Sequence, residues 1–198
     1  MGLIIKDKIA QLKKGYPTVS DKYNVQGGIY EGADALLFGD LLAYGSATGH
    51  YVKMVTTSTV ANLAGICLAT NVKLANRYPG DNNSKVETLT GEAFNLLVRG
   101  FVAVAIADAT ATYTTAKATY EAIIADDTKT AEEKKAAKTT FDAATKTAVD
   151  SAAHEGAPVY LVNGAFATTG TDVVPGAYFM GVAEIVDGAV VAEINYKM

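Results

Sequence analysis

The alternation of apolar and polar positions is clearest over residues 91–107, around which the rest of the chain can be interpreted. Apolar side chains alternate with others from Phe94 to Val98, which predicts a strand with one buried face. From Phe101 to Ile106 both faces are apolar, which predicts a strand that is also closely covered on its second face. Gly100 lies between the two parts and, because it has no side chain, allows a bend or a bulge there.

Short apolar runs, separated by Gly, Ser, Thr and Asn, occur on both sides of a long Ala-rich segment. Such runs predict strands, and their spacing is typical of a β-barrel or a β-sandwich. Asp187-Gly188 lies between two of the runs and predicts a tight hairpin with a type I′ turn. The remaining expected strands are 28–31, 36–38, 40–44, 50–56, 63–69, 85–89, 158–162, 165–168, 177–186 and 189–196.

Residues 109–155 differ in composition, because they contain no Gly and are dominated by Ala, Thr, Lys and Glu. Thr130 followed by Glu133 is the signature of a capping box at a helix start. We expect an antiparallel helical hairpin, whose narrow Ala-rich stripes bury little area, so that it must lean on the β-body or on a neighbouring subunit. The two apolar stripes are Tyr113, Ala116, Tyr120, Ile123 and Ile124, and Ala137, Phe141, Ala144, Ala148 and Ala152.

These patterns predict a mainly β protein: a barrel-like or sandwich-like body with an inserted α-helical hairpin and an N-terminal arm. The expected division is an arm at 1–27, a first part of the β-body at 28–108, the hairpin at 109–155 and a second part of the β-body at 156–198. Since the strand pattern resumes after the hairpin, we expect both parts of the body to share one core.

The N-terminal arm combines apolar residues with lysines. Residues 1–27 carry a net charge of +3, whereas the whole chain carries −4. A basic arm on an acidic body is expected to meet an acidic surface, either of a neighbouring copy or of another protein. The alternative is a short helix that packs on its own domain. The residues expected to bind a partner are Leu3, Ile4, Ile5, Lys6, Ile9, Leu12, Lys13, Lys14 and Tyr16.

No motif in the sequence predicts catalysis, a cofactor or a metal site. The Gly-rich stretch 45–50 lacks the Lys-Ser/Thr pair of a phosphate-binding loop, and is expected to be a turn. A calcium-loop-like spacing that starts at Asp81 places Lys85 where a ligand oxygen belongs. His50 and His154 have no Gly-x-Ser-x-Gly element to pair with, and the single Cys67 is expected to be an inert core thiol. The mild net charge and the lack of a basic aromatic groove argue against nucleic-acid binding.

Three segments resemble the small β-domain decoration, or cement, proteins of tailed bacteriophage heads. They are Leu63–Thr70, a strand entered through Gly65; Leu89–Val102, a Gly-led strand that turns at a second Gly; and Met180–Ile194, the closing hairpin. The resemblance implies a non-enzymatic virion protein that forms a homotrimer on the outer capsid lattice. It also implies that the major capsid protein is the partner and that an N-terminal arm reaches the shell. The helical insertion is a departure from the simplest members.

Two other functions compete with capsid decoration. One is a phage tail-tube or connector protein, which also combines a β-body with a helix and an arm. The other, from a different class, is a ligand-binding β-barrel or a hydrolase with a site assembled from distant residues. The apolar run Leu3–Ile5 is too short for a signal peptide, so we expect synthesis in the host cytoplasm, no membrane association, and a final place on the virion.

Overall fold

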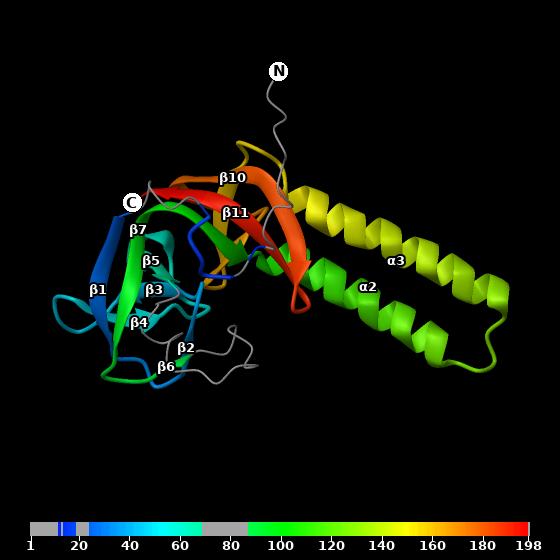
Figure 1. Ribbon diagram of the computed structural model, residues 1–198, viewed down its shortest axis with the longest axis horizontal. Coiled ribbons are helices and arrows are strands. Elements are labelled where there is room, and N and C mark those ends of the chain that lie inside the picture. Colours follow the sequence, from blue (N-terminus) through cyan, green and yellow to red (C-terminus); the bar gives the residue numbers. More distant parts are fainter. Residues whose placement is uncertain (1–11, 13, 19–23, 69–86, 198) are drawn as a thin grey trace, which may run out of the picture.

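The computed structural model describes residues 12, 14–18, 24–68 and 87–197, and it confirms a mainly β fold with a closed five-stranded barrel and a helical hairpin (Figure 1). The strands and helices follow the expected order along the chain. Their bounds are β1 Asn24–Tyr30, β2 Leu36–Leu37, β3 Leu41–Tyr44, β4 His50–Lys53, the 3₁₀ turn η1 Val60–Asn62, β5 Leu63–Leu68, β6 Glu87–Thr88, β7 Ala93–Ala105, α2 Ala107–Ala125, α3 Ala131–Ala152, β8 Pro158–Val162, β9 Ala165–Ala167, β10 Asp172–Val186 and β11 Ala189–Lys197.

The barrel consists of β1, β4, β3, β5 and β7, and the pairing of β1 with β7 closes it. β1 and β4 are parallel, while the other neighbours are antiparallel. One hydrophobic cluster takes side chains from all five of these strands, and each buried side chain in it is at most 6% exposed. Partly buried neighbours pack against this cluster. This cluster gives the barrel a filled core. The barrel residues in it are Tyr30, Leu42, Tyr51, Ala64, Cys67, Phe94 and Leu96.

β7 belongs to both halves of the fold. Its first half pairs with β1 and β5, and its second half pairs with β11. The change falls at Arg99 and Gly100: Arg99 is opposite both Asn24 of β1 and Lys197 of β11, and Gly100 has a φ of 143°. Few side chains tolerate that backbone angle, which explains the Gly at this position. The bend predicted at Gly100 therefore coincides with the point where the strand leaves the barrel.

The second half of the fold is an antiparallel sheet in the order β7, β11, β10, β8 and β9. The β10–β11 turn has positive φ at both Asp187 (50°) and Gly188 (82°), as the type I′ prediction requires. Both faces of this sheet carry buried side chains. Val102, Ala192 and Ile194 lie in the main core, which also contains the base of the helical hairpin. We call this the inner face, and the opposite side the outer face.

The base of the helical hairpin is part of the main core. Ala109 and Tyr113 of α2 and Ala148 and Ala152 of α3 are all at most 9% exposed. The start of α2 is also fastened to the sheet, because the Asp108 carboxylate accepts hydrogen bonds from the amide and the hydroxyl of Thr168 at 3.0 and 2.6 Å.

Beyond its base, the hairpin projects away from the β-body (Figure 1). Tyr120 and Phe141 stack between the two helices with ring centroids 5.1 Å apart. The predicted capping box forms, since Thr130 and Glu133 exchange side chain–backbone hydrogen bonds. Within the described part of the chain, neither helix has the length and apolar character needed to cross a membrane.

β1 begins at Asn24, whereas the sequence predicted a strand over residues 28–31. Residues 24–27 fall within the arm expected at 1–27, and here they form the start of β1. Their strand conformation comes from pairing with β7, where Gln26 lies opposite Leu96 and Gly27 opposite Asn95. The polar turn expected at 78–84 lies outside the described residues.

Candidate docking surface

A short N-terminal segment runs along β7. We call Leu12 and residues 14–18 the strap. The Gly15 amide donates to the Ala103 carbonyl at 2.8 Å, the Ala103 amide donates to the Tyr16 carbonyl at 3.2 Å, and the Thr18 amide donates to the Phe101 carbonyl at 3.2 Å. Pro17 forms an antiparallel bridge with Val102. Because β11 occupies one side of this half of β7, the strap occupies the other and covers that edge.

The N-terminal end of the strap lies on the outer face. Leu12 is 4% exposed and packs with Ala103 of β7 and Val191 of β11, beside Val182 and Val186 of β10. In β11, Val191 alternates with the inner-face residues Val190 and Ala192, which fixes the outer face as the one Leu12 covers. Carboxylates of this face hold the strap as well: Glu184 accepts a hydrogen bond from the Leu12 amide, and Glu193 accepts one from the Thr18 hydroxyl.

A buried carboxylate fixes the middle of the strap. Asp40 is 8% exposed, and its oxygens lie 2.9 Å from Lys14 Nζ of the strap and 2.8 Å from Lys53 Nζ of β4. The Leu37 amide also donates to it at 2.9 Å. Two positions further along the strap, the Tyr16 ring contacts the Phe38 ring edge-on, with ring centroids 6.4 Å apart.

Opposing effects act on the Asp40 carboxyl. Burial by itself raises its pKa, but the nearby Lys14 ammonium and the hydrogen bonds from Lys53, Lys14 and the Leu37 amide outweigh burial. The pKa of Asp40 therefore lies below its ordinary value, and the group is a carboxylate at neutral pH. A charge this buried is stable only while its cationic partners stay in place, so the strap and the barrel are coupled through it.

Three of the predicted partner-binding residues, Leu12, Lys14 and Tyr16, lie in the strap, and their contacts given above are with the chain's own body. Their partner-binding role stays a prediction. The others, Leu3, Ile4, Ile5, Lys6, Ile9 and Lys13, lie outside the described residues. Sequence reasoning missed Asp40 and Lys53, because only the fold brings them beside Lys14. An acidic residue directly after Gly39, between two apolar runs, was the one available signal.

The cluster nearest to a catalytic arrangement is Glu31, Ser46 and His50. Glu31 accepts hydrogen bonds from the Ser46 amide at 2.8 Å and from the Ser46 hydroxyl at 2.7 Å, and its Oε1 lies 2.7 Å from His50 Nδ1. The Ser46 amide and hydroxyl, followed by His50, lower the pKa of Glu31. Ser46 donates to the carboxylate rather than to the histidine, so the hydrogen bond that pairs a serine nucleophile with a histidine base is not made in this cluster. The cluster closes the turn predicted at 45–50, in which the Gly45 amide donates to the His50 carbonyl at 2.7 Å.

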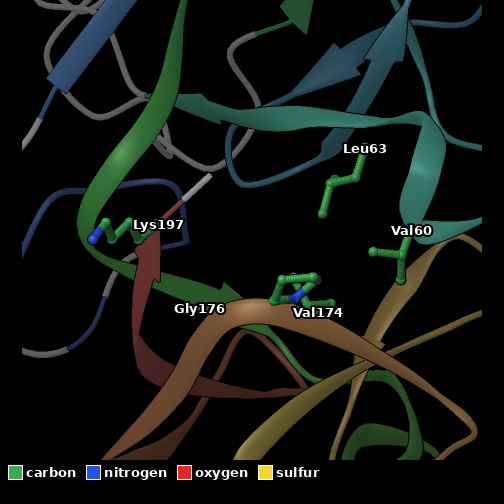
Figure 2. Close-up of a pocket in the computed structure, with 6 residues that line it drawn as sticks. Val60, Leu63, Val174, Gly176 and Lys197 are labelled. Carbon is green, nitrogen blue, oxygen red and sulfur yellow. The ribbon is translucent and has the colours of Figure 1, made fainter.

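A half-open cavity of about 450 Å³ lies between η1 and the start of β5 on one side and β10 on the other (Figure 2). Its lining is apolar except for Lys197, whose ammonium points away from the cavity in Figure 2. Among the described residues, no group of three or more His, Cys, Asp or Glu side chains could hold a metal ion. The cavity residues are Val60, Leu63, Val174, Pro175, Gly176 and Lys197.

No protein-family model matches the chain, and no curated protein matches it.

Proposed function

We propose that this protein decorates a bacteriophage capsid, binding the outer shell lattice through its N-terminal arm and stabilising the lattice. The observation that carries the proposal is the strap. It fastens the root of an arm that is both apolar and basic to the body, through a covered strand edge and a buried ion pair. A firmly rooted arm can transmit load between the body and a partner, as a fastening protein must do.

The positions of the resembling segments support this proposal. The three segments contain β5, most of β7 and the turn-side parts of β10 and β11, and the order β5, β7, β11, β10 is continuous in the large sheet. The similarity therefore covers one connected structural unit rather than scattered turns. The filled barrel core also favours a structural role over the ligand-binding barrel considered above.

We further propose that the protein acts as a homotrimer with the major capsid protein as its partner. The strap already covers the edge of the second half of β7, so that edge needs no neighbouring subunit. The proposal of a trimer is consequently based on the resemblance and not on an uncovered edge of β7.

Deletion of residues 1–11 is expected to reduce binding to undecorated phage heads by at least tenfold while leaving the strap in place. Leu3, Ile4, Ile5 and Ile9 are the branched aliphatic residues removed. Burying two or three such side chains contributes roughly 3–9 kcal/mol before the cost of ordering the arm, and each 1.4 kcal/mol corresponds to about tenfold in affinity. Occupancy is measured by cosedimentation of purified protein with heads that lack it.

Matched variants separate apolar anchoring from charge. Ile5→Asp with Ile9→Asp is expected to reproduce most of the loss, whereas Lys6→Ala with Lys8→Ala is expected mainly to change the salt dependence, because exposed ion pairs contribute only about 0–1 kcal/mol each. Undiminished binding after the deletion would rule out the arm as anchor.

A further inference from the structure

We propose that the outer face of β7, β11, β10 and β8 is the surface that docks on the shell, with the helical hairpin on the opposite side. This inference rests on the proposed function and assigns it a surface. The partner is a shell protein that offers an apolar area next to acidic groups, which would receive the lysines of the arm.

An apolar patch on the outer face supports this assignment. Val173 and Tyr178 of β10 are both 47% exposed, and they are among the few large apolar side chains of the described residues that stay this exposed. Val173 lies opposite Tyr160 of β8, and Tyr178 lies opposite Asn195 of β11, which in turn lies opposite Phe101 of β7. Residues directly opposite in an antiparallel pair share a face, so all of these residues lie on the outer face, where the polar Asn195 separates Tyr178 from Phe101.

The register also fixes which face this is. Phe179 and Ile194, the neighbours of Tyr178 and Asn195, belong to the inner core with the helices. On β8, Val159 and Leu161 belong to the same inner core, so Tyr160 between them points outward. The patch therefore lies on the side of the sheet away from the base of α2 and α3.

The arm starts from this same face. Leu12 is held on it by Ala103, Val191 and the Glu184 carboxylate. Residues 1–11 connect to the body through Leu12. An anchor carried by these residues therefore begins at the outer face. Rotating the molecule to present the helices to the shell would place the root of the arm and the apolar patch on the far side.

The test compares exposed apolar residues on different parts of the molecule. Val173→Asp with Tyr178→Asp is expected to weaken cosedimentation with undecorated heads at least tenfold. Two controls make the same chemical change elsewhere: Ile124→Asp near the tip of the hairpin, where Ile124 is 40% exposed, and Tyr44→Asp at the end of β3, where Tyr44 is 61% exposed. Both controls are expected to bind within twofold of the unaltered protein. Thermal unfolding of each variant checks that it is folded.

Each outcome decides the proposal. Unaltered binding by the Val173/Tyr178 variant, or an equal loss with Ile124→Asp, would overturn the assigned surface while leaving capsid decoration intact. If the unaltered protein itself fails to bind heads, the proposed function fails, and the assigned surface fails with it. Should the double variant not unfold cooperatively, Tyr178→Glu alone tests the same surface, because it places one negative charge against the apolar and acidic area proposed for the partner. A tenfold loss is again expected, and binding within twofold would overturn the assignment.

Discussion

Asp40→Asn is expected to lower the free energy of unfolding by about 2–4 kcal/mol, which is less than the 3–5 kcal/mol typical of breaking a fully buried pair, because both lysines keep some contact with water. The substitution leaves Lys14 and Lys53 facing a neutral amide inside a site where the acid is 8% exposed. Urea unfolding at pH 7 measures the loss. Asp142→Asn is a matched control, since Asp142 lies 2.7 Å from Lys138 on the surface of α3, and removing such a helical pair costs about 0.3–0.5 kcal/mol.

A second readout follows the strap itself. In the Asp40→Asn variant, the amides of Gly15 and Ala103, which hold the strap on β7, are expected to exchange with solvent faster than those of β5. The stability that the Asp40 carboxylate contributes should decrease as the pH is lowered. Because the folded pKa of Asp40 is below its ordinary value, its contribution is complete above about pH 4 and is lost as the pH falls through the folded pKa. Equal stability of the variant and the unaltered protein at pH 7 would contradict the coupling between strap and barrel.

Trimming the helical hairpin and removing it are expected to have very different effects. Replacing residues 118–138 with a short Gly/Ser linker keeps Tyr113, Phe141, Ala148 and Ala152, so the trimmed protein should unfold cooperatively with its midpoint changed by only a few degrees. Replacing residues 110–154 removes all four of these side chains, three of them buried, and uncovers the inner face of the sheet. Losing a buried aromatic residue alone costs about 3–5 kcal/mol, a large part of the 5–15 kcal/mol that stabilises a typical domain.

Differential scanning calorimetry of the two variants decides this point. If the protein without residues 110–154 unfolds cooperatively near the temperature of the unaltered protein, the base of the hairpin does not belong to the core. The sequence pattern alone favoured that outcome, because the strand pattern resumes after the hairpin and ends in a tight β-turn. The structure buries the ends of the stripes in the core, and Phe141, which stacks on Tyr120 between the two helices, also packs against that core.

Features set by residues close in sequence could be predicted. The Asp187-Gly188 turn and the Thr130/Glu133 capping box each depend on a few neighbouring residues, and both occur as expected. The bend at Gly100 was also visible, because Gly interrupts a long apolar run. The sequence did not indicate that the strand leaves a closed barrel at this bend. The barrel is closed by the pairing of β1 with β7, which are far apart in sequence.

The strap and its ion pair illustrate what sequence could not provide. Lys14 and Asp40 are 26 positions apart, and neither shows an unusual local pattern. Lys14 looked like one of several solubilising lysines, and its ion pair with Asp40 depends on β7 bringing the N-terminal segment beside the barrel. In the same way, residues 24–27 carry no apolar alternation, and only the edge of β7 makes them a strand. Leu12 was expected to bind a partner, and in the structure its side chain packs on the outer face of its own sheet.

Cryo-electron microscopy of the virus particle that carries this protein tests capsid decoration most directly. We predict density for the barrel and the projecting hairpin at regular positions on the outside of the head, with the face that carries Leu12 and Tyr178 against the shell and the hairpin directed away from it. Density for this fold in the tail, or heads with no such density, would contradict the account.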